Sequence, residues 1–419
     1  MHKVYIEGNA ISSSKAILGA LPALKEGRSV NISGLSRQVM LANENTFRKM
    51  SVNLRPAGDN QVDAYVVVTE KPSSKFILSV DNTGDQYTGQ LRANLSYLNG
   101  NVGGTGQTAV LSFTTSPDHF SDVKQFGFLY NAPQPGSGDN IYFTASYSDV
   151  NSGRILSSQG FSLDAAGKGS ALGLYYVKNM YRTENVKESL ALGLNYNQYK
   201  NDTTMVFLGE PIQLGVDIDS MPLNLTYQRS NISPASKDSV SYSVSLIHNL
   251  PGGGKNSDRQ YDMYRPGTKA DYDVWRASFN HQHMFKSNWI SNIALNGQYA
   301  NQRLIYPEQM GLGGMYSIRG LDERDVAGDK AIRASLELYT PEVFSKGQRF
   351  LVFLDTGRFS NVSPQPGELT SGTAVSTGVG WRLNSRGYSL AANWGYMLDG
   401  MVESEKHKSK FHFLASKVF

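Results

Sequence analysis

Apolar and polar residues alternate with a period of two along most of the chain after Lys75. The alternation is clearest in residues 91–97, 190–196, 242–246, 292–299 and 390–396. Successive side chains of a strand point to opposite faces, so each segment predicts a strand with one apolar and one polar face. In a soluble sandwich the apolar face forms the core, whereas in a transmembrane barrel it contacts lipid and the polar face lines the lumen.

Three features favour the barrel. The polar faces carry Ser, Asn, Gly and Gln more often than Lys or Glu, and strands often end on Tyr or Trp, as in the aromatic girdles of membrane barrels. The 345 residues from Lys75 to Phe419 correspond to about sixteen strands, at roughly 20–22 residues per strand and connection. A hydrophobic content of 40%, a mean hydropathy of −0.36 and the lack of an eighteen-residue apolar run exclude a helical membrane protein. We therefore predict an all-β transmembrane barrel of about sixteen antiparallel strands.

The composition also narrows the functional classes. The net charge is only +4 and no basic block is present, so we expect no nucleic-acid partner. The sequence contains no cysteine, which fits a compartment where free thiols oxidise. We find no nucleophile–base pair, nucleotide motif or zinc-binding spacing, and we expect neither enzyme activity nor a cofactor or metal. His281 and His283 would share a strand face, but no third ligand is near them, so we interpret them as ordinary polar residues.

Residues 1–72 differ from the rest of the chain. A short strand at residues 4–8 precedes a predicted helix from Ser12 to Glu26, in which Pro22 should kink the helix or end it early. A second helix is predicted for residues 33–41, followed by two alternating strands at residues 50–54 and 62–68. This β-α-α-β-β order predicts a small α+β domain, which the pattern alone does not distinguish from a generic soluble module.

One glycine-rich segment, residues 311–321, presents a single arginine, Arg319. Glycine accepts positive φ and close backbone approach, so the segment can fold tightly back on itself. We expect Arg319 and Gly320 to form its tip, on a scaffold made by Gly311, Gly313, Gly314, Ile318 and Leu321.

Two carboxylates are candidate partners for this arginine. Alternation places Glu337 on the strand face that Leu336 and Leu338 do not share, and it places Asp355 on the face that Leu354 does not share. Because the leucines should face lipid, both carboxylates should face the lumen. A guanidinium inside the barrel pairs bidentately with a carboxylate, and removing either partner leaves a charge uncompensated. The alternative is a solvated turn with a surface arginine.

The arginine-bearing glycine-rich segment and the strand that carries Asp355 both resemble motifs of two-partner secretion translocators, the TpsB or haemolysin-activator family. Residues 318–321 are similar to its Val-Arg-Gly-aromatic loop motif, with Leu321 in place of the aromatic, and residues 353–357 are similar to its Asp-containing strand. Residues 21–27, 35–37 and 43–45 resemble the second POTRA domain of this family. The final strand ends on Phe419, which resembles the assembly signal of outer-membrane barrels.

The resemblance implies a POTRA-like domain over residues 1–72 and a transmembrane barrel over residues 73–419, with an inserted loop around 311–330. It implies a Gram-negative outer-membrane pore whose periplasmic POTRA domain binds the N-terminal secretion domain of a large exoprotein. The exoprotein then crosses through the lumen without a nucleotide energy source, and Arg319, Gly320, Glu337 and Asp355 form a gating latch. Outer-membrane lipid and the barrel-assembly machinery are further expected partners.

Members of the family also carry an export signal, a plug helix and a first POTRA domain. None of these is found in the sequence, so we interpret the chain as a mature fragment that lacks its natural start. A barrel-assembly factor of the same superfamily is an alternative function, and a passive porin or barrel enzyme is another. A porin needs neither a POTRA domain nor an arginine loop.

Overall fold

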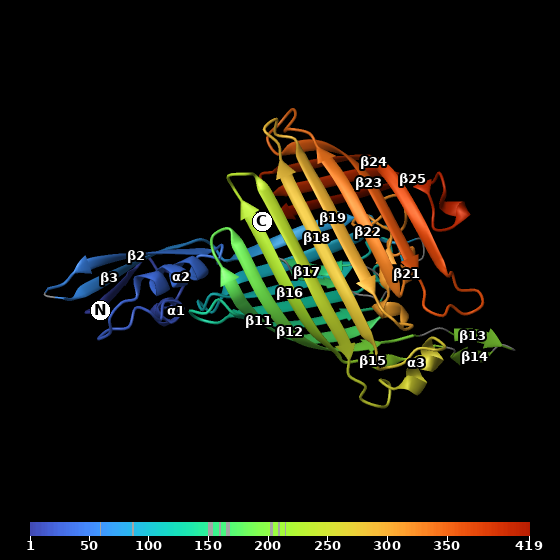
Figure 1. Ribbon diagram of the computed structural model, residues 1–419, viewed down its shortest axis with the longest axis horizontal. Coiled ribbons are helices and arrows are strands. Elements are labelled where there is room, and N and C mark those ends of the chain that lie inside the picture. The colour runs from blue at the N-terminus through green and yellow to red at the C-terminus, as the bar shows by residue number, and fades with distance from the viewer. Residues whose placement is uncertain are drawn as a thin grey trace.

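The computed structural model describes residues 1–419 except 59, 86–87, 150–153, 159–160, 165–167, 202–203, 208–209 and 214. A small N-terminal unit projects from one end of a large barrel (Figure 1). None of the helices in the described residues is long and apolar enough to cross a membrane.

The N-terminal unit is a three-stranded sheet covered by two helices. Its elements are β1 (Val4–Glu7), α1 (Ser14–Ala20), α2 (Ile32–Ala42), β2 (Arg48–Pro56) and β3 (Val62–Glu70). The strand order is β1-β3-β2, with β1 parallel to β3 and β2 antiparallel to it. Side chains of Ser13 and Asn31 cap the two helices by accepting hydrogen bonds from backbone N–H groups. The helix predicted for residues 12–26 is wrong in length, because α1 ends at Ala20, just before Pro22.

The rest of the chain forms a closed antiparallel barrel. Its strands are β4 (Ser74–Asp81), β5 (Arg92–Val102), β6 (Gln107–Thr115), β7 (Gln125–Pro133), β8 (Asn140–Ser148), β11 (Gly169–Arg182), β12 (Val186–Tyr199), β15 (Ile218–Ser220), β16 (Pro222–Ser233), β17 (Asp238–Asn249), β18 (Asp273–Met284), β19 (Ile290–Tyr299), β22 (Lys330–Tyr339), β23 (Gln348–Ser360), β24 (Ser371–Ser385), β25 (Tyr388–Asp399) and β26 (Ser409–Val418). β15 and β16 both pair with β12 and are two parts of one strand, so the described barrel has sixteen strands. The prediction of about sixteen antiparallel strands is confirmed. β26 closes the ring against β4.

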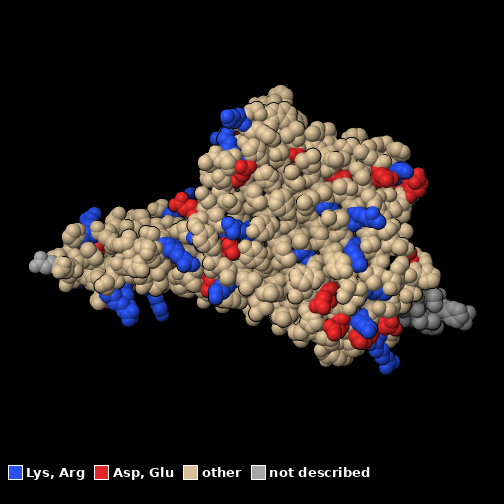
Figure 2. Space-filling view, in the orientation of Figure 1, with Lys and Arg blue, Asp and Glu red and all other residues tan. Residues whose placement is uncertain are grey.

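The two faces of the wall follow the period-two pattern. Val352 and Leu354 of β23 are exposed on the outer face, whereas Phe353 and Asp355 between them are buried on the inner face. Most of the barrel wall seen in Figure 2 carries uncharged side chains. Such a wall suits a hydrocarbon environment, where charged side chains are costly.

The barrel has two unlike rims. At the proximal rim, defined by contact with the N-terminal unit, Asn45 donates a hydrogen bond to Gly100 O (2.9 Å) and Asn101 donates to Ser12 Oγ (3.1 Å). Glu44 also forms an ion pair with Arg182. The terminal Phe419, which follows β26, is exposed at this end, and its backbone N–H donates to Phe76 O (2.9 Å).

Longer connections lie at the opposite, distal rim. They contain the paired segments β9 (Arg154–Ser158) and β10 (Phe161–Asp164), and β13 (Thr204–Phe207) and β14 (Glu210–Gln213). They also contain α3 (Asp258–Tyr264), η1 (Tyr306–Glu308), β20 (Met310–Leu312), β21 (Val326–Gly328) and η2 (Glu403–Glu405). The glycine-rich segment at residues 251–254 leads into α3, which the sequence pattern did not predict.

Candidate functional site

The connection between β19 and β22 is folded into the barrel. A short hairpin of β20 and β21 forms its base, with Gly311 opposite Ala327. Gly313, Gly314 and Gly320 adopt φ values of +111°, +100° and +117°, a region that side-chain-bearing residues rarely adopt. These glycines allow the chain to turn back between β20 and β21, which pair antiparallel.

Arg319, at the tip of this loop, is 3% exposed and contacts both predicted carboxylates. Its Nε and Nη2 donate to Asp355 Oδ2 and Oδ1, each at 2.7 Å, in a bidentate pair. Its Nη1 donates to Glu337 Oε1 at 2.6 Å, and Nη2 also donates to Ser335 Oγ at 3.1 Å. Asp355 is fully buried and also accepts the Arg319 backbone N–H at 3.1 Å.

The guanidinium contacts four inward-facing side chains on two adjacent strands. Ser335 of β22 lies opposite Asp355 of β23, and Glu337 lies opposite Phe353. The Arg319 Cζ lies 3.5 Å from the centroid of the Phe353 ring, which is a cation–π distance. Hydrogen-bond acceptors and an aromatic face therefore surround the cation.

Apolar contacts hold the neighbouring residues of the tip. Ile318 and Leu321 are buried in a cluster with Leu312, Phe359 and Met397. Gly395 of β25 permits the approach, because a Cβ atom there would lie 2.6 Å from the Arg319 carbonyl carbon. On the same wall, the buried His412 Nε2 accepts the Gly320 backbone N–H at 3.5 Å.

The structure thus brings together Arg319, Glu337 and Asp355, and it places the predicted scaffold residues around them. The inserted segment around 311–330 is not a plain loop, since it includes β20 and β21. Sequence reasoning missed Ser335, Phe353 and Gly395. The alternation that placed Asp355 inward also placed Phe353 inward, so this signal was present for the aromatic ring.

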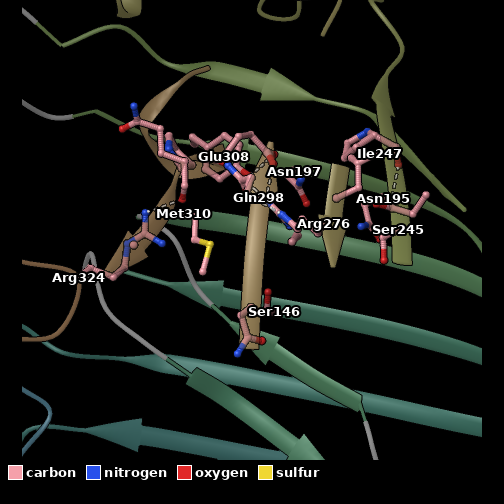
Figure 3. Close-up of a pocket in the computed structure, with 18 of the residues that line it drawn as sticks. Ser146, Asn195, Asn197, Ser245, Ile247, Arg276, Gln298, Glu308, Met310 and Arg324 are labelled. Atoms are coloured by element: carbon pink, nitrogen blue, oxygen red, sulfur yellow. Dashed lines mark hydrogen bonds and ion pairs between the residues drawn. The ribbon is translucent and has the colours of Figure 1, made fainter. Parts of the chain in front are cut away.

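The remaining lumen is polar. A cavity of about 630 Å³ lies between the inserted loop and the opposite wall, formed by β8, β11, β12 and β16–β19. Its wall is mainly uncharged, and residues such as Ser146, Asn195, Asn197 and Ser245 point into it (Figure 3). Glu308 and Arg324 of the inserted connection border its other side (Figure 3).

A closed barrel with an apolar exterior, a polar lumen and a loop ion-paired inside it defines a membrane-spanning β-barrel protein with a partly filled pore. Residues 62–383 match the family described as haemolysin secretion/activation protein ShlB/FhaC/HecB. The chain belongs to this family of outer-membrane two-partner secretion translocators.

Curated relatives agree with this assignment. The heme/hemopexin transporter protein HuxB of Haemophilus influenzae is 24% identical over 366 residues, which cover 84% of this chain and 62% of the relative. A second HuxB sequence from Haemophilus influenzae is 25% identical over 370 residues, with the same two coverages. The chain therefore spans about three fifths of the length of these relatives.

Solved structures share the fold. CdiB from Escherichia coli matches with a TM-score of 0.77 at 18% identity, covering 100% of this chain and 76% of CdiB. CdiB from Acinetobacter baumannii matches with a TM-score of 0.73 at 17% identity, covering 100% and 74% of the two chains. BamA from Haemophilus ducreyi lacking POTRA domains 1–3 gives a TM-score of 0.64 at 17% identity, covering 100% and 84%.

Proposed function

We propose that this protein secretes a large partner exoprotein across the outer membrane by two-partner secretion. Family membership supports this function, and the observation that carries it is the polar lumen with an arginine-tipped loop ion-paired to its wall. A lumen lined largely by Ser, Asn and Gln offers hydrogen bonds to an unfolded polypeptide. Folding of the exoprotein outside, which stabilises a domain by about 5–15 kcal/mol, disfavours its return and needs no nucleotide.

In this proposal the N-terminal unit is a periplasmic POTRA domain that binds the exoprotein. The unit has the β-α-α-β-β order expected from its sequence and is attached to the proximal rim of the barrel. β2 lies at an edge of the sheet, so an extended segment of the exoprotein can add to it as a further strand. The curated relatives are named heme/hemopexin transporters, so an exoprotein for heme or hemopexin uptake is the first partner to test.

Arg319, Gly320, Glu337 and Asp355 form the latch that holds the inserted loop in this proposal. We expect Arg319→Ala and Asp355→Ala to lower secretion of the exoprotein at least about tenfold, because each leaves a buried charge without its partner. Secreted and cell-associated exoprotein would be quantified by immunoblot, and barrel folding by heat-modifiable electrophoretic mobility.

A matched control is Lys406→Ala, which removes exposed ion pairs with Asp399, the last residue of β25, and with Glu403 in the β25–β26 connection at the distal rim. This variant should secrete normally, since exposed ion pairs contribute little. Normal secretion by both latch variants would disprove the latch. Insertion of other outer-membrane proteins that depends on this chain would instead favour a barrel-assembly factor.

A further inference from the structure

A second ionic cluster lies at the distal rim, away from the latch. It consists of two arginines and two carboxylates, Arg265, Arg303, Asp329 and Glu368, which we name the rim clasp. Arg265 is 1% exposed and Asp329 is fully buried. The four charges sum to zero, and burial of this many ionisable groups is costly unless each one is paired.

The rim clasp joins three connections that are far apart in the sequence. Arg265 comes from the β17–β18 connection, Arg303 and Asp329 come from the two ends of the inserted connection, and Glu368 comes from the β23–β24 connection. Arg265 Nη1 donates to Asp329 Oδ1 at 2.8 Å, and its Nε donates to Glu368 Oε1 at 3.1 Å. Arg303 donates to both oxygens of Glu368 at 2.9 Å.

Asp329 connects the rim clasp to the backbone around it. Its Oδ1 also accepts the Leu304 N–H at 3.0 Å, and its Oδ2 accepts the Val362 N–H at 2.9 Å. Gln309 Nε2 donates to Oδ1 at 2.9 Å and to Asn361 Oδ1 at 3.0 Å. One carboxylate therefore fixes both ends of the inserted connection and the start of the β23–β24 connection.

The β17–β18 connection, residues 250–272, forms a packed cap beside this cluster. Its Tyr261 and Tyr272 are buried with Leu304 and Ile305 of the inserted connection and with Val274 of β18. The cap and the inserted connection therefore share one apolar core at the distal rim.

We propose that the rim clasp is a second closure of the pore, in which Asp329 positions the base of the inserted loop independently of the Arg319 latch at its tip. The proposal rests on the pore function proposed above. Opening the distal rim to a polypeptide requires the rim clasp to break, because the clasp joins the cap to the inserted connection and to residues 361–370.

The test measures passive permeation without any exoprotein, so its outcome is independent of secretion. The purified full chain would be placed in planar lipid bilayers, and the frequency of channel openings would be counted for Glu368→Gln and Arg265→Met. Both substitutions remove one charge while largely keeping side-chain size. We expect at least about a tenfold rise in openings for each variant, since one buried partner loses its counter-charge.

A second readout separates the rim clasp from general loosening of the loop. The chain has no cysteine, so Ile318→Cys introduces a unique thiol that is buried while the tip is seated. In the clasp variants this thiol should still react slowly with a maleimide. The control Lys255→Ala removes an exposed ion pair with Asp217 at the same rim and should leave openings unchanged.

Three results would overturn the proposal. One is wild-type opening frequency in both clasp variants when heat-modifiable mobility shows a folded barrel. Another is fast labelling of the tip thiol in those variants, which would mean that tip and base move together. The third is an equal rise in openings for Lys255→Ala, which would mean that any change in the cap opens the pore.

Discussion

At the residue scale, the geometry around Arg319 depends on the planar shape of the guanidinium. Two of its N–H groups match the two oxygens of Asp355, while a third reaches Glu337 and the flat face lies on Phe353. A lysine ammonium has the same charge but neither the fork nor the planar face. The site is therefore selective for arginine rather than for positive charge alone.

Backbone approach at the tip leads to a prediction about Gly395. Gly395→Val should displace the tip, because a Cβ atom at this position would lie 2.6 Å from the Arg319 carbonyl carbon and oxygen. Overpacking of this kind costs about 1–3 kcal/mol, so labelling of an Ile318→Cys thiol should rise about tenfold or more. Maleimide labelling in detergent measures this rate.

Gly297→Val is the matched control for this prediction. A Cβ atom at Gly297 would meet only Ala331 O, at 3.7 Å, so the substitution should leave the thiol protected. Slow labelling in Gly395→Val would show that the tip tolerates the larger side chain. In that case the close approach at Gly395 does not determine how the loop is seated.

At the scale of elements, the N-terminal unit depends on a small core of its own. Ile17 of α1 and Leu21, the residue after α1, are fully buried and pack in one cluster with Leu35 of α2 and Val66 of β3. Pro22 ends α1 early, which turns Leu21 into this core rather than continuing the helix. Pro22, which is incompatible with a helix over residues 12–26, thus also determines how Leu21 packs in the core of the N-terminal unit.

Leu21→Ala should destabilise this unit by about 2–5 kcal/mol, the usual effect of removing a large buried aliphatic side chain. Limited proteolysis of the full chain in detergent should then cleave within residues 1–72 sooner, while the barrel fragment persists. Ile32→Ala, at an exposed position that begins α2, should digest at the wild-type rate. Equal cleavage of both variants would contradict the assigned core.

At the scale of the whole molecule, the rim clasp joins three distal connections through buried and partly buried charges. Burial alone raises the pKa of Glu368, but hydrogen bonds from Arg303, the Gln365 N–H and Arg265 outweigh it and lower the pKa to about 2. Burial lowers the pKa of Arg265, and the Asp329 and Glu368 carboxylates more than reverse this, so its pKa is raised. Glu368 and Arg265 therefore keep their charges over a wide pH range.

This shift predicts the pH dependence of the closed state. A carboxylate whose folded pKa is depressed stabilises the fold above its unfolded pKa of about 4.3, and loses that contribution as pH falls towards about 2. Channel openings of the wild-type chain should thus stay constant from pH 7.5 to 5 and rise only below about pH 4. Glu368→Gln should lack this acid-induced rise. Opening with a midpoint near pH 6 would contradict the assignment.

The sequence by itself determined the strand faces and the chemistry at the loop tip. Period-two alternation placed Glu337 and Asp355 inward, and the glycines around Arg319 marked a chain that reverses tightly. These features are local, because side-chain direction and φ preference depend on a residue and its neighbours. The approximate number of strands also followed from length, because a membrane-spanning strand with its connection averages roughly 20–22 residues.

Only the tertiary structure decided the register and the long-range contacts. Register placed Phe353 and Ser335 beside Arg319, and it set Gly395 against the tip. In the rim clasp, Arg265 pairs with residues 64 and 103 positions away. These ion-pair partners depend on how three connections pack at the distal rim of the barrel. A local sequence pattern does not encode this packing, because the residues that contact each other come from different connections.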